Sequence, residues 1–478
     1  MKLNMKTFIL LLIINYFTFS ETLELCKTCE INSFNQAFNL LSAGDTLFIK
    51  EDVYQGGISF SNLKGKENEF IHVIGKDNVI IEGGNTAMQL SDCEYVEFKN
   101  IVFQRQNLNG VNIDDAGTFE SPTHHINFID CTFRDIIATG NNDLLKLSGL
   151  DTFLIYNCKF ENGSPEGSAV DMVGCHSGTI SQNFFENHGS NSIQCKGGTS
   201  EILIEKNYFL NGGARAINLG GSTGLAFFRP QDANYEASNL MVYSNIFVGG
   251  ETPFAFVGSE GVEVFNNSII NPTKWIFRIL QETVDEDRFI ECGDNSLINN
   301  LFYVNSNISF TPVNIGSNTR PETFDISDNL FYNTDNQNWK PNLIDINSNY
   351  LNINPMINQD YTSLDTSSSL VSKGQYLENP KYDFNSKAFL NPRSIGAIEG
   401  GVELVSSVYN KSDIEYMWNG DFINFSSKVI ISEIYIYDLL GKQVLNKKVN
   451  AKECGIYLIR NNYLIILKGK NTFNLLIN

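Results

Sequence analysis

The stretches AVDMVGCHSG (169–178), SIQCKGG (192–198) and AINLGGSTG (216–224) have one pattern in common. Each alternates apolar and polar residues, as a strand with one buried face does, and each then breaks at glycine. Two stretches between them, SQNFFENHG (181–189) and EKNYFLNGG (205–213), are also alike. The region 166–222 is therefore one structural unit that is repeated.

The repeat extends along most of the chain with a period close to the 24 residues that separate Asn183 from Asn207. Longer gaps elsewhere indicate insertions at turns. The chain has neither an L-x-x-L-x-L pattern nor intervening helices, so leucine-rich repeats are excluded and a parallel β-helix with three short strands per coil is predicted. We expect a ladder at Asn100, Cys131, Cys158, Asn183, Asn207, Asn245, Asn267, Asn300 and Asn329. We expect a second, internal stack at Phe103, Phe133, Phe160, Phe185, Phe209, Phe247, Phe302 and Phe331.

The chain is acidic, with a formal net charge of −20 over 478 residues. This charge argues against nucleic acid or an anionic membrane surface as a partner. It does not exclude an acidic polysaccharide, because a local basic patch or bound calcium reverses the field where the ligand lies.

The first twenty residues have the pattern of a signal peptide. Lys2 and Lys6 precede an apolar run at 8–19, and 18–20 offers a cleavage site. This run is too short to span a membrane and no later run is long enough, so we expect a secreted protein. All nine cysteines follow the signal, and Cys26 and Cys29 favour a local disulfide over a metal site.

A short amphipathic helix is predicted at 33–42, where it would cap the open end of the solenoid. The stretches AGDTLFI (43–49), IIEGG (80–84) and IGAIE (395–399) resemble the right-handed parallel β-helix superfamily of secreted bacterial proteins. The resemblance covers about residues 30–400. It implies an all-β right-handed parallel β-helix over 21–400, with the helix as its N-terminal cap.

The end of the chain differs. Residues 401–412 read as a linker, and ISEIYIYDLLGKQVLNKKV (431–449) predicts a hairpin. The motifs YDLLGK (437–442) and GIY (455–457) resemble the C-terminal sorting domain of type IX secretion cargo in Bacteroidetes. The resemblance implies a small β-sandwich-like domain at 413–478 that addresses the protein to the outer-membrane secretion machinery. The alternative is a small β-domain that binds a ligand.

Side chains that alternate with the apolar ones point away from the core, and copies on adjacent coils lie about 4.8 Å apart. Gly220 and Ala255 are among these outward residues and are small enough to form the floor of a groove. In coil order the outward residues form one polar strip, which consists of Lys146, Asp171, Gln194, Lys196, Asn218 and Arg278.

The longest insertion in the repeat, residues 221–238, follows this strip. Long ordered insertions on solenoids are usually functional, and aromatic faces beside a polar groove suit sugar rings. We therefore expect a polysaccharide to be bound by Arg229, Phe228, Asn218, Gln194, Lys146, Arg278 and Tyr235.

Such a groove fits a polysaccharide lyase, which cleaves a uronate-containing chain by β-elimination. The reaction needs a base for the C5 proton, a cation on the carboxylate and a proton for the leaving oxygen. Lys196 and Arg215 are candidate bases, with Asp171 and His176 close by. Asp171 and Glu166 are candidate ligands of a calcium ion that would neutralise the carboxylate.

Each of these residues also has a purely structural interpretation. Asp171 falls between Lys146 and Lys196 on neighbouring coils, and a simple ion pair accounts for it equally well. Arg215 has the parity of an inward residue and fits a turn where it bonds carbonyl groups. His176 fits a solvated position just past a turn.

Comparison with known β-helix enzymes narrows the possible activities only because certain catalytic motifs are missing from this chain. The chain lacks the adjacent aspartates and Gly-His-Gly of polygalacturonases and the Arg-x-Pro-x-x-Arg of pectate lyases. CKGGTSEILIEKNYF (195–209) lies where a polysaccharide lyase of family 6 has a basic residue before glycine. The alternatives to a lyase are a non-catalytic glycan-binding or adhesin-like β-helix and a β-helix glycoside hydrolase. We expect a monomer in each case.

Overall fold

The computed structural model describes residues 20–117, 120–285 and 287–400 and five strands beyond them. The chain divides into two units, Met1–Gly400 and Gly401–Asn478. Residues 1–19 of the predicted signal peptide and the predicted linker at 401–412 lie outside the described residues. The described part of the chain contains no helix that is long and apolar enough to cross a membrane.

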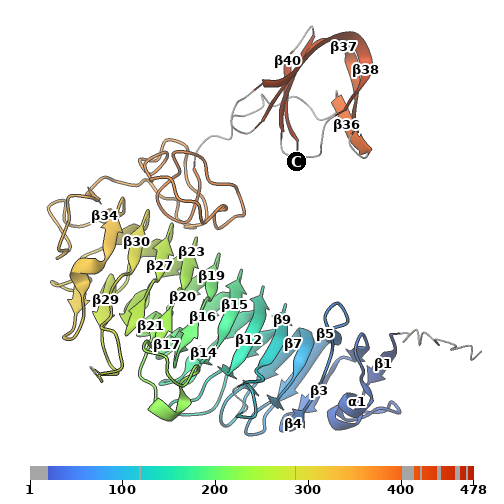
Figure 1. The fold of residues 1–478 in the computed structure, drawn as a ribbon, viewed down its shortest axis with the longest axis vertical. Coiled ribbons are helices and arrows are strands. Elements are labelled where there is room, and N and C mark those ends of the chain that lie inside the picture. Colours follow the sequence, from blue (N-terminus) through green and yellow to red (C-terminus); the bar gives the residue numbers. More distant parts are fainter. Residues whose placement is uncertain are drawn as a thin grey trace, which may run out of the picture. The chain divides into compact units, whose positions relative to one another are not determined.

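The first unit is a stack of coils joined by parallel pairing (Figure 1). One of its faces is a ten-stranded sheet in which each strand pairs only with its counterparts on adjacent coils. Its strands are β4 (Ile58–Ser61), β6 (Met88–Ser91), β8 (Val111–Asp114), β11 (Leu145–Ser148), β14 (Ser168–Val173), β17 (Asn191–Lys196), β21 (Arg215–Gly220), β25 (Phe254–Val257), β29 (Phe277–Leu280) and β32 (Val313–Ile315).

The remaining faces belong to a sheet of 25 parallel strands. In the middle of the stack, β14 is followed by two strands of this larger sheet, β15 and β16, before the chain returns as β17. The larger sheet begins with β1 (Thr22–Leu25), β2 (Thr46–Ile49), β3 (Asp52–Gln55), β5 (Ile71–Glu82), β7 (Glu94–Gln104), β9 (Thr123–Ile129), β10 (Thr132–Arg134), β12 (Leu150–Tyr156), β13 (Lys159–Glu161), β15 (His176–Ser181), β16 (Phe184–Glu186) and β18 (Thr199–Ser200). It continues with β19 (Leu203–Glu205), β20 (Tyr208–Leu210), β22 (Ala237–Ser238), β23 (Met241–Tyr243), β24 (Ile246–Val248), β26 (Ser259–Glu260), β27 (Glu263–Phe265), β28 (Ser268–Ile270), β30 (Ser296–Ile298), β31 (Leu301–Val304), β33 (Asp325–Ser327), β34 (Leu330–Asn333) and β35 (Tyr350–Leu351).

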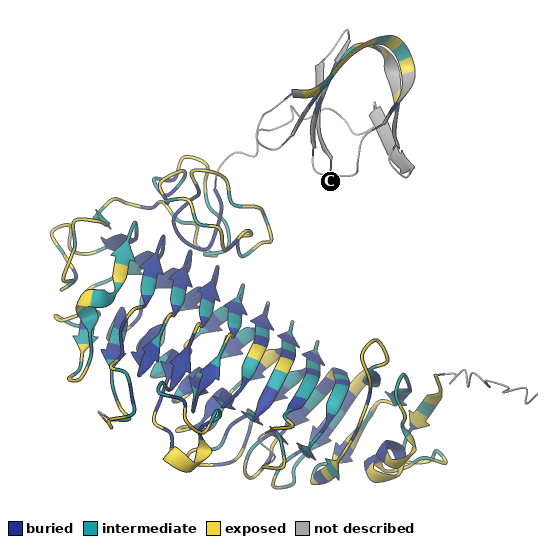
Figure 2. Ribbon diagram, viewed as in Figure 1, coloured by how far each residue is buried: buried dark blue, intermediate teal, exposed yellow. Residues whose placement is uncertain are grey.

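The predicted phenylalanine stack fills the interior. Ring centroids of Phe160 and Phe185 are 4.9 Å apart, and those of Phe209 and Phe247 are 4.5 Å apart, with nearly parallel planes. Ile269 takes the position between Phe247 and Phe302, so the run of rings is interrupted there. Burial of these large rings removes apolar surface from water and so stabilises the core. Figure 2 shows the strands in the buried and intermediate colours, with most exposed residues in loops.

The predicted asparagine ladder is confirmed from Asn183 to Asn329. Asn183 donates its backbone N–H to Asn207 Oδ1 at 2.9 Å, and Asn207 donates to Asn245 Oδ1 at 2.8 Å. Each buried side-chain amide therefore has partners on neighbouring coils, as buried polar groups require. The ladder continues one coil further than predicted, to Asn349.

The prediction for Asn100 is wrong by one position. Ile101 is in register with Val79, and the next residue, Val102, is in register with Thr132, so Ile101 and not Asn100 lies beside Cys131. Asn100 occupies the preceding turn with φ 56°. Cys131 itself is buried with a free thiol, as predicted.

The N-terminal cap is confirmed. Helix α1 (Phe34–Leu40) begins after Ser33, whose hydroxyl accepts a hydrogen bond from the backbone N–H of Gln36. Phe34 and Phe38 are buried against the first coils, whose unpaired edge the helix covers. Cys26 and Cys29 form the predicted local disulfide.

Beyond the last coils, residues 374–400 fold back along one corner of the larger sheet, and we call this segment the strap. Asn299 donates to Gln375 O, Asn266 donates to Ser394 O, and Ser244 donates to Tyr382 O. The three contacts lie on three successive coils, and along the strap they meet the coil of Asn299 first, then that of Ser244 and then that of Asn266. The strap thus covers a corner that would otherwise present unpaired turn residues.

The second unit is a single antiparallel sheet in its described residues. Strand β37 pairs with β38 along most of its length, which corresponds to the predicted hairpin. The strands are β36 (Ile414–Asn419), β37 (Phe422–Asp438), β38 (Gln443–Tyr457), β39 (Tyr463–Gly469) and β40 (Thr472–Ile477).

Candidate functional site

The outward row of the ten-stranded sheet has the predicted order. Register pairs Lys146 with Asp171, Asp171 with Gln194, and Gln194 with Asn218, and the row continues through Ala255 to Arg278. The apolar neighbours of these residues face the core. The polar strip therefore exists as one surface on parallel strands, but its residues differ in what they contact.

Asp171 is at the centre of a buried ionic network. Its side chain is 2% exposed and lies 2.7 Å from Lys146 Nζ and 3.1 Å from Lys196 Nζ. Lys146 also contacts the buried carboxylate of Asp143 at 3.1 Å. Burial alone would lower the pKa of Lys146, but the carboxylates of Asp171 and Asp143 outweigh it and raise this pKa. Burial, with the neighbouring Asp171 charge, raises the pKa of Asp143.

Among the residues that the structure describes, Arg215 bonds two side chains and no turn carbonyl. Its guanidinium donates to Glu282 Oε1 at 2.6 Å and to Asn218 Oδ1 at 3.1 Å. Asn218 is 2% exposed, and its amide donates to Gly220 O. The prediction that Asn218 contacts substrate is therefore wrong, because both ends of the side chain are used and covered. Ala255, which was predicted to form part of the floor of a groove, is also fully buried.

Arg278 extends the row beyond Ala255. Its Nε donates to Asn314 Oδ1 at 2.9 Å, and its guanidinium lies 4.3 Å from the ring centroid of Trp275. The ammonium of Lys274 lies over the same ring at 4.3 Å. Burial, followed by the nearby charge of Arg215, lowers the pKa of Arg278. The charge of Arg215 thus acts on Arg278 at this end of the strip.

His176 and Arg229 lie away from the strip, although they were predicted to join it. Arg229 donates two hydrogen bonds to the carboxylate of Asp151, of 2.6 and 2.8 Å. His176 Nδ1 lies 2.9 Å from the same carboxylate. Asp151 and His176 belong to β12 and β15 of the larger sheet. Burial opposes ionisation of Asp151, but the hydrogen bonds from Arg229 and His176 prevail and lower its pKa to about 2.

Glycine permits this approach of the loop to the coils. A Cβ on Gly174, which has φ +60°, would lie 2.5 Å from Arg229 Cβ, and one on Gly198, φ +88°, would lie 2.4 Å from Arg229 O. A side chain at either position would push the loop away. The loop that carries Arg229 is therefore held against the turns that follow β14 and β17 of the ten-stranded sheet. His176 helps to hold this loop and is not part of the strip.

Phe228 and Tyr235 were predicted to contact sugar, but they pack inside the loop. Phe228 is 2% exposed, and its ring lies 5.2 Å from that of Phe289. Tyr235 packs against the same cluster. The exposed aromatic residue is instead Phe227, which is 72% exposed at the end of η1 (Leu225–Phe227). Figure 2 shows this turn in the exposed colour.

Glu236 anchors the base of the loop and was not anticipated. It is fully buried, and it accepts hydrogen bonds from the backbone N–H groups of Gly197 at 2.9 Å and Thr223 at 2.8 Å. Asp151 could have been found from the sequence, because it lies 25 residues before His176, about one coil. Nothing in the sequence pattern marks Glu236.

The predicted calcium ligands do not fit that ion. Both oxygens of Asp171 face lysine ammonium groups, which occupy the positions a cation would take. Glu166 is an exposed turn residue. In the part of the chain that the structure describes, no group of three or more His, Cys, Asp and Glu side chains is arranged to hold a metal ion.

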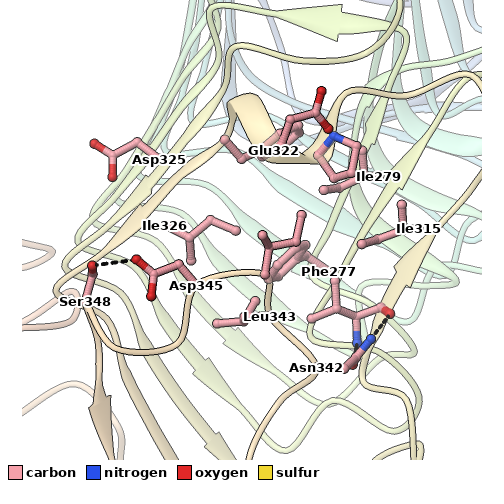
Figure 3. A pocket seen from close by; sticks show the side chains of 14 residues that line it. Phe277, Ile279, Ile315, Glu322, Asp325, Ile326, Asn342, Leu343, Asp345 and Ser348 are labelled. Atoms are coloured by element: carbon pink, nitrogen blue, oxygen red, sulfur yellow. Dashed lines mark hydrogen bonds between the residues drawn. The ribbon is translucent and has the colours of Figure 1, made fainter.

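A hollow of about 150 Å³ lies at the end of the solenoid, away from the strip. Figure 3 shows the inward residues Phe277 and Ile279 together with Leu343 on its walls, and Glu322 and Asp345 at its rim. Apolar walls with carboxylates at the mouth do not suit an acidic sugar. This hollow is where the last coils become irregular and the interior opens.

Comparisons with known proteins agree with this architecture. A family model described as "Right handed beta helix region" matches residues 109–302, and no curated protein matches the chain. The crystal structure of pectate lyase Pel9A superposes with a TM-score of 0.51 at 13% identity, over 80% of this chain and 96% of that one. The protein is a right-handed parallel β-helix.

Two further structures have lower scores. An alginate lyase from Paenibacillus sp. str. FPU-7 has a TM-score of 0.39 at 14% identity, covering 70% of this chain and 99% of that one. The A-module of the Azotobacter vinelandii mannuronan C-5 epimerase AlgE4 has a TM-score of 0.40 at 10% identity, covering 63% and 90%.

Proposed function

We propose that the protein binds an acidic, uronate-containing polysaccharide along the strip and cleaves it as a polysaccharide lyase. The observation that carries the proposal is Arg278, whose guanidinium has no carboxylate within 4.0 Å among the described residues. It lies near Arg215 in a chain of net charge −20. Cations gathered against the overall charge of a protein are suited to bind an anion. Pel9A, which has the same fold, is named a pectate lyase.

The elimination would use two residues of the strip, Arg278 and Lys196, together with the neighbouring pair of Arg215 and Glu282. Arg278 and Arg215 would neutralise the uronate carboxylate and so acidify the C5 proton. Glu282, one third exposed beside Arg215, is our candidate to accept that proton. The C4–O bond then breaks as the C4=C5 double bond forms, and the electron pair leaves on the oxygen. Lys196, whose ammonium lies 3.1 Å from the Asp171 carboxylate, would protonate that oxygen.

A non-catalytic glycan-binding protein is the second candidate. It is favoured by the ion pairs that occupy Lys146, Lys196 and Arg215. Cations in this state can hold a polyanion, but they are poor bases because deprotonation would leave the partner carboxylate uncompensated. Binding without cleavage needs only the cations.

Incubation with pectate, alginate, chondroitin sulfate and neutral xylan distinguishes the two candidates. We expect ultraviolet absorbance of the unsaturated product with at least one acidic polymer. Arg278→Ala should lower kcat/KM about a hundredfold, and Glu282→Gln should abolish elimination while binding is retained. Arg320→Ala, which removes a guanidinium outside the strip, is the control. Binding without product across the panel would favour the second candidate, and neither binding nor product would overturn both.

We also propose that the protein is secreted through the outer membrane. The support is the N-terminal signal pattern and the resemblance of 413–478 to a type IX sorting domain. In a Bacteroidetes host, the full chain should reach the cell surface or medium, while a chain lacking 413–478 should stay inside the outer membrane. Equal distribution of the two would contradict the sorting role.

A further inference from the structure

A second hollow, of about 360 Å³, lies where the middle of the strap, at residues 384–386, meets the larger sheet. The ten-stranded sheet contributes none of its lining, so it is distinct from the strip. Its volume is within the range of small-ligand sites. It is lined by Asn157, Gln182, Asn183, Phe184, Lys206, Tyr208, Phe384, Asn385 and Ser386.

Lys206 is the charged group of this hollow and is weakly neutralised. Its side chain is 9% exposed, yet its carboxylate neighbour, Glu205, is 3.9 Å away. It donates one long hydrogen bond, of 3.4 Å, to Ser386 Oγ, and its ammonium lies 5.3 Å from the ring centroid of Tyr382. Lys146 and Lys196 on the strip have carboxylate contacts of 2.7 and 3.1 Å by comparison. A nearly buried ammonium with such weak partners favours an incoming anion, which would offset its desolvation.

Aromatic rings form the adjacent wall. The rings of Phe184 and Tyr208 are stacked with centroids 5.8 Å apart, and Phe384 on the strap meets Tyr208 at 6.4 Å. All three rings are only partly buried. They offer apolar surface to the C–H groups of a ring-shaped ligand, which a simple inorganic anion does not have.

Amide groups at the rim add hydrogen-bonding capacity. Gln182 accepts from Tyr156 through Oε1, which leaves its NH2 group for a ligand. Asn157 donates to Asp130 and Asn385 donates to Thr362 O, so in both residues the Oδ1 acceptor remains. A hydroxyl-rich ligand can use donors and acceptors placed in this way.

We propose that this hollow binds one acidic sugar unit, with its carboxylate toward Lys206, as a second glycan site apart from the strip. This second site rests on the proposed function for the class of its ligand, an acidic sugar, but it uses none of the strip residues. The site can therefore fail while the proposed function stands, and the reverse also holds.

The test is calorimetric titration of the full chain carrying Arg278→Ala, which weakens the strip. The probes are tetragalacturonate and tetramannuronate, with cellotetraose and inorganic phosphate as comparisons. Lys206→Met in this background should lower affinity for an acidic tetrasaccharide about tenfold or more, because one charge-assisted contact is lost. The matched control is Lys99→Met, an exposed lysine on an earlier coil of the same sheet, which should leave affinity unchanged.

A second variant keeps the test decisive if Lys206→Met does not fold. Asn385→Trp, at an exposed strap position, should fill the hollow and cause a similar loss without removing a charge. The proposal is overturned if Lys206→Met and Lys99→Met bind the acidic probes equally. It is also overturned if cellotetraose or phosphate binds as tightly as the acidic tetrasaccharides.

Discussion

At the scale of single residues, the carboxylate of Asp171 lies between two ammonium groups and is almost completely buried. Removing one member of a buried ion pair leaves the other charge uncompensated, which costs more than the pair contributes. We expect Asp171→Asn to lower the free energy of unfolding by about 3 kcal/mol. Urea denaturation followed by circular dichroism measures this change.

Asp52→Asn is the control for that measurement, because Asp52 pairs with Lys27 on the surface. Its effect should be much smaller, because water and salt screen an ion pair on the surface. Equal effects of the two substitutions would contradict the account of the buried network.

His188 predicts a separate dependence of stability on pH. Burial lowers its pKa to about 4, whereas an unfolded histidine titrates near 6.5. Between these values the unfolded chain binds a proton that the folded chain does not, so protonation favours unfolding. The contribution of neutral His188 to the free energy of unfolding is fully present above about pH 6.5, and the free energy of unfolding falls by about 3 kcal/mol as the pH approaches 4.

Comparison of urea midpoints at neutral pH and near pH 4 checks this prediction. His188→Gln should flatten the decline, whereas His72→Gln, at a half-exposed position, should leave it intact. A decline of the same size in both variants would exclude His188 as its source.

Sequence reasoning at this scale succeeded where strand parity decides the answer. Alternation was enough to place Lys146, Asp171 and Gln194 in one outward row. It could not reveal how deeply Asp171 is buried, since that depends on the two lysine stems and Asp143 around it. Nor could it show that Arg229 bonds Asp151, because a loop can cross either edge of the strip.

At the scale of elements, the loop at 221–236 depends on one buried carboxylate. Glu236 accepts from Gly197 through one oxygen and from Thr223 through the other, so Glu236→Gln would turn an amide donor toward one of these two N–H groups. We expect the loop to loosen, with a cost of about 2 kcal/mol. Limited proteolysis with mass spectrometry should then detect faster cleavage within 221–236.

Glu251→Gln provides the comparison, because Glu251 is exposed and pairs only with Lys274 among the described residues. Unchanged cleavage of the loop in Glu236→Gln would argue that the Arg229–Asp151 contact alone fastens it.

Element positions were predictable to within about one residue where the repeat is regular. The error at Asn100 arose because both the ladder position and the turn before it favour asparagine, for different reasons. Asparagine tolerates the left-handed backbone of that turn and also makes the ladder bonds. Only the strand register distinguishes the two positions.

At the scale of the whole molecule, the net charge of −20 repels a polyanion while the strip attracts it. Salt weakens the long-range repulsion first, because the screening length falls from about 30 Å at 0.01 M to about 10 Å at 0.1 M. We therefore expect the association rate with oligogalacturonate to rise over this range. The dissociation rate should rise too, since the contacts on the strip also weaken.

Surface plasmon resonance at both salt concentrations measures the two rates. Arg278→Ala should raise the dissociation rate at either concentration and leave the salt trend of association unchanged. A fall of the association rate with salt would show that local attraction outweighs the overall repulsion even at long range.

The asparagine ladder also bears on how such a molecule changes in length. Each ladder asparagine from Asn183 to Asn329 donates to its counterpart on the next coil in the same way, so no coil in this run needs a unique neighbour. A duplicated segment of 24 residues, such as 184–207, would bring its own asparagine and phenylalanine and could join both stacks. Tandem duplication or loss of a coil would then lengthen or shorten the strip in evolution without a new fold.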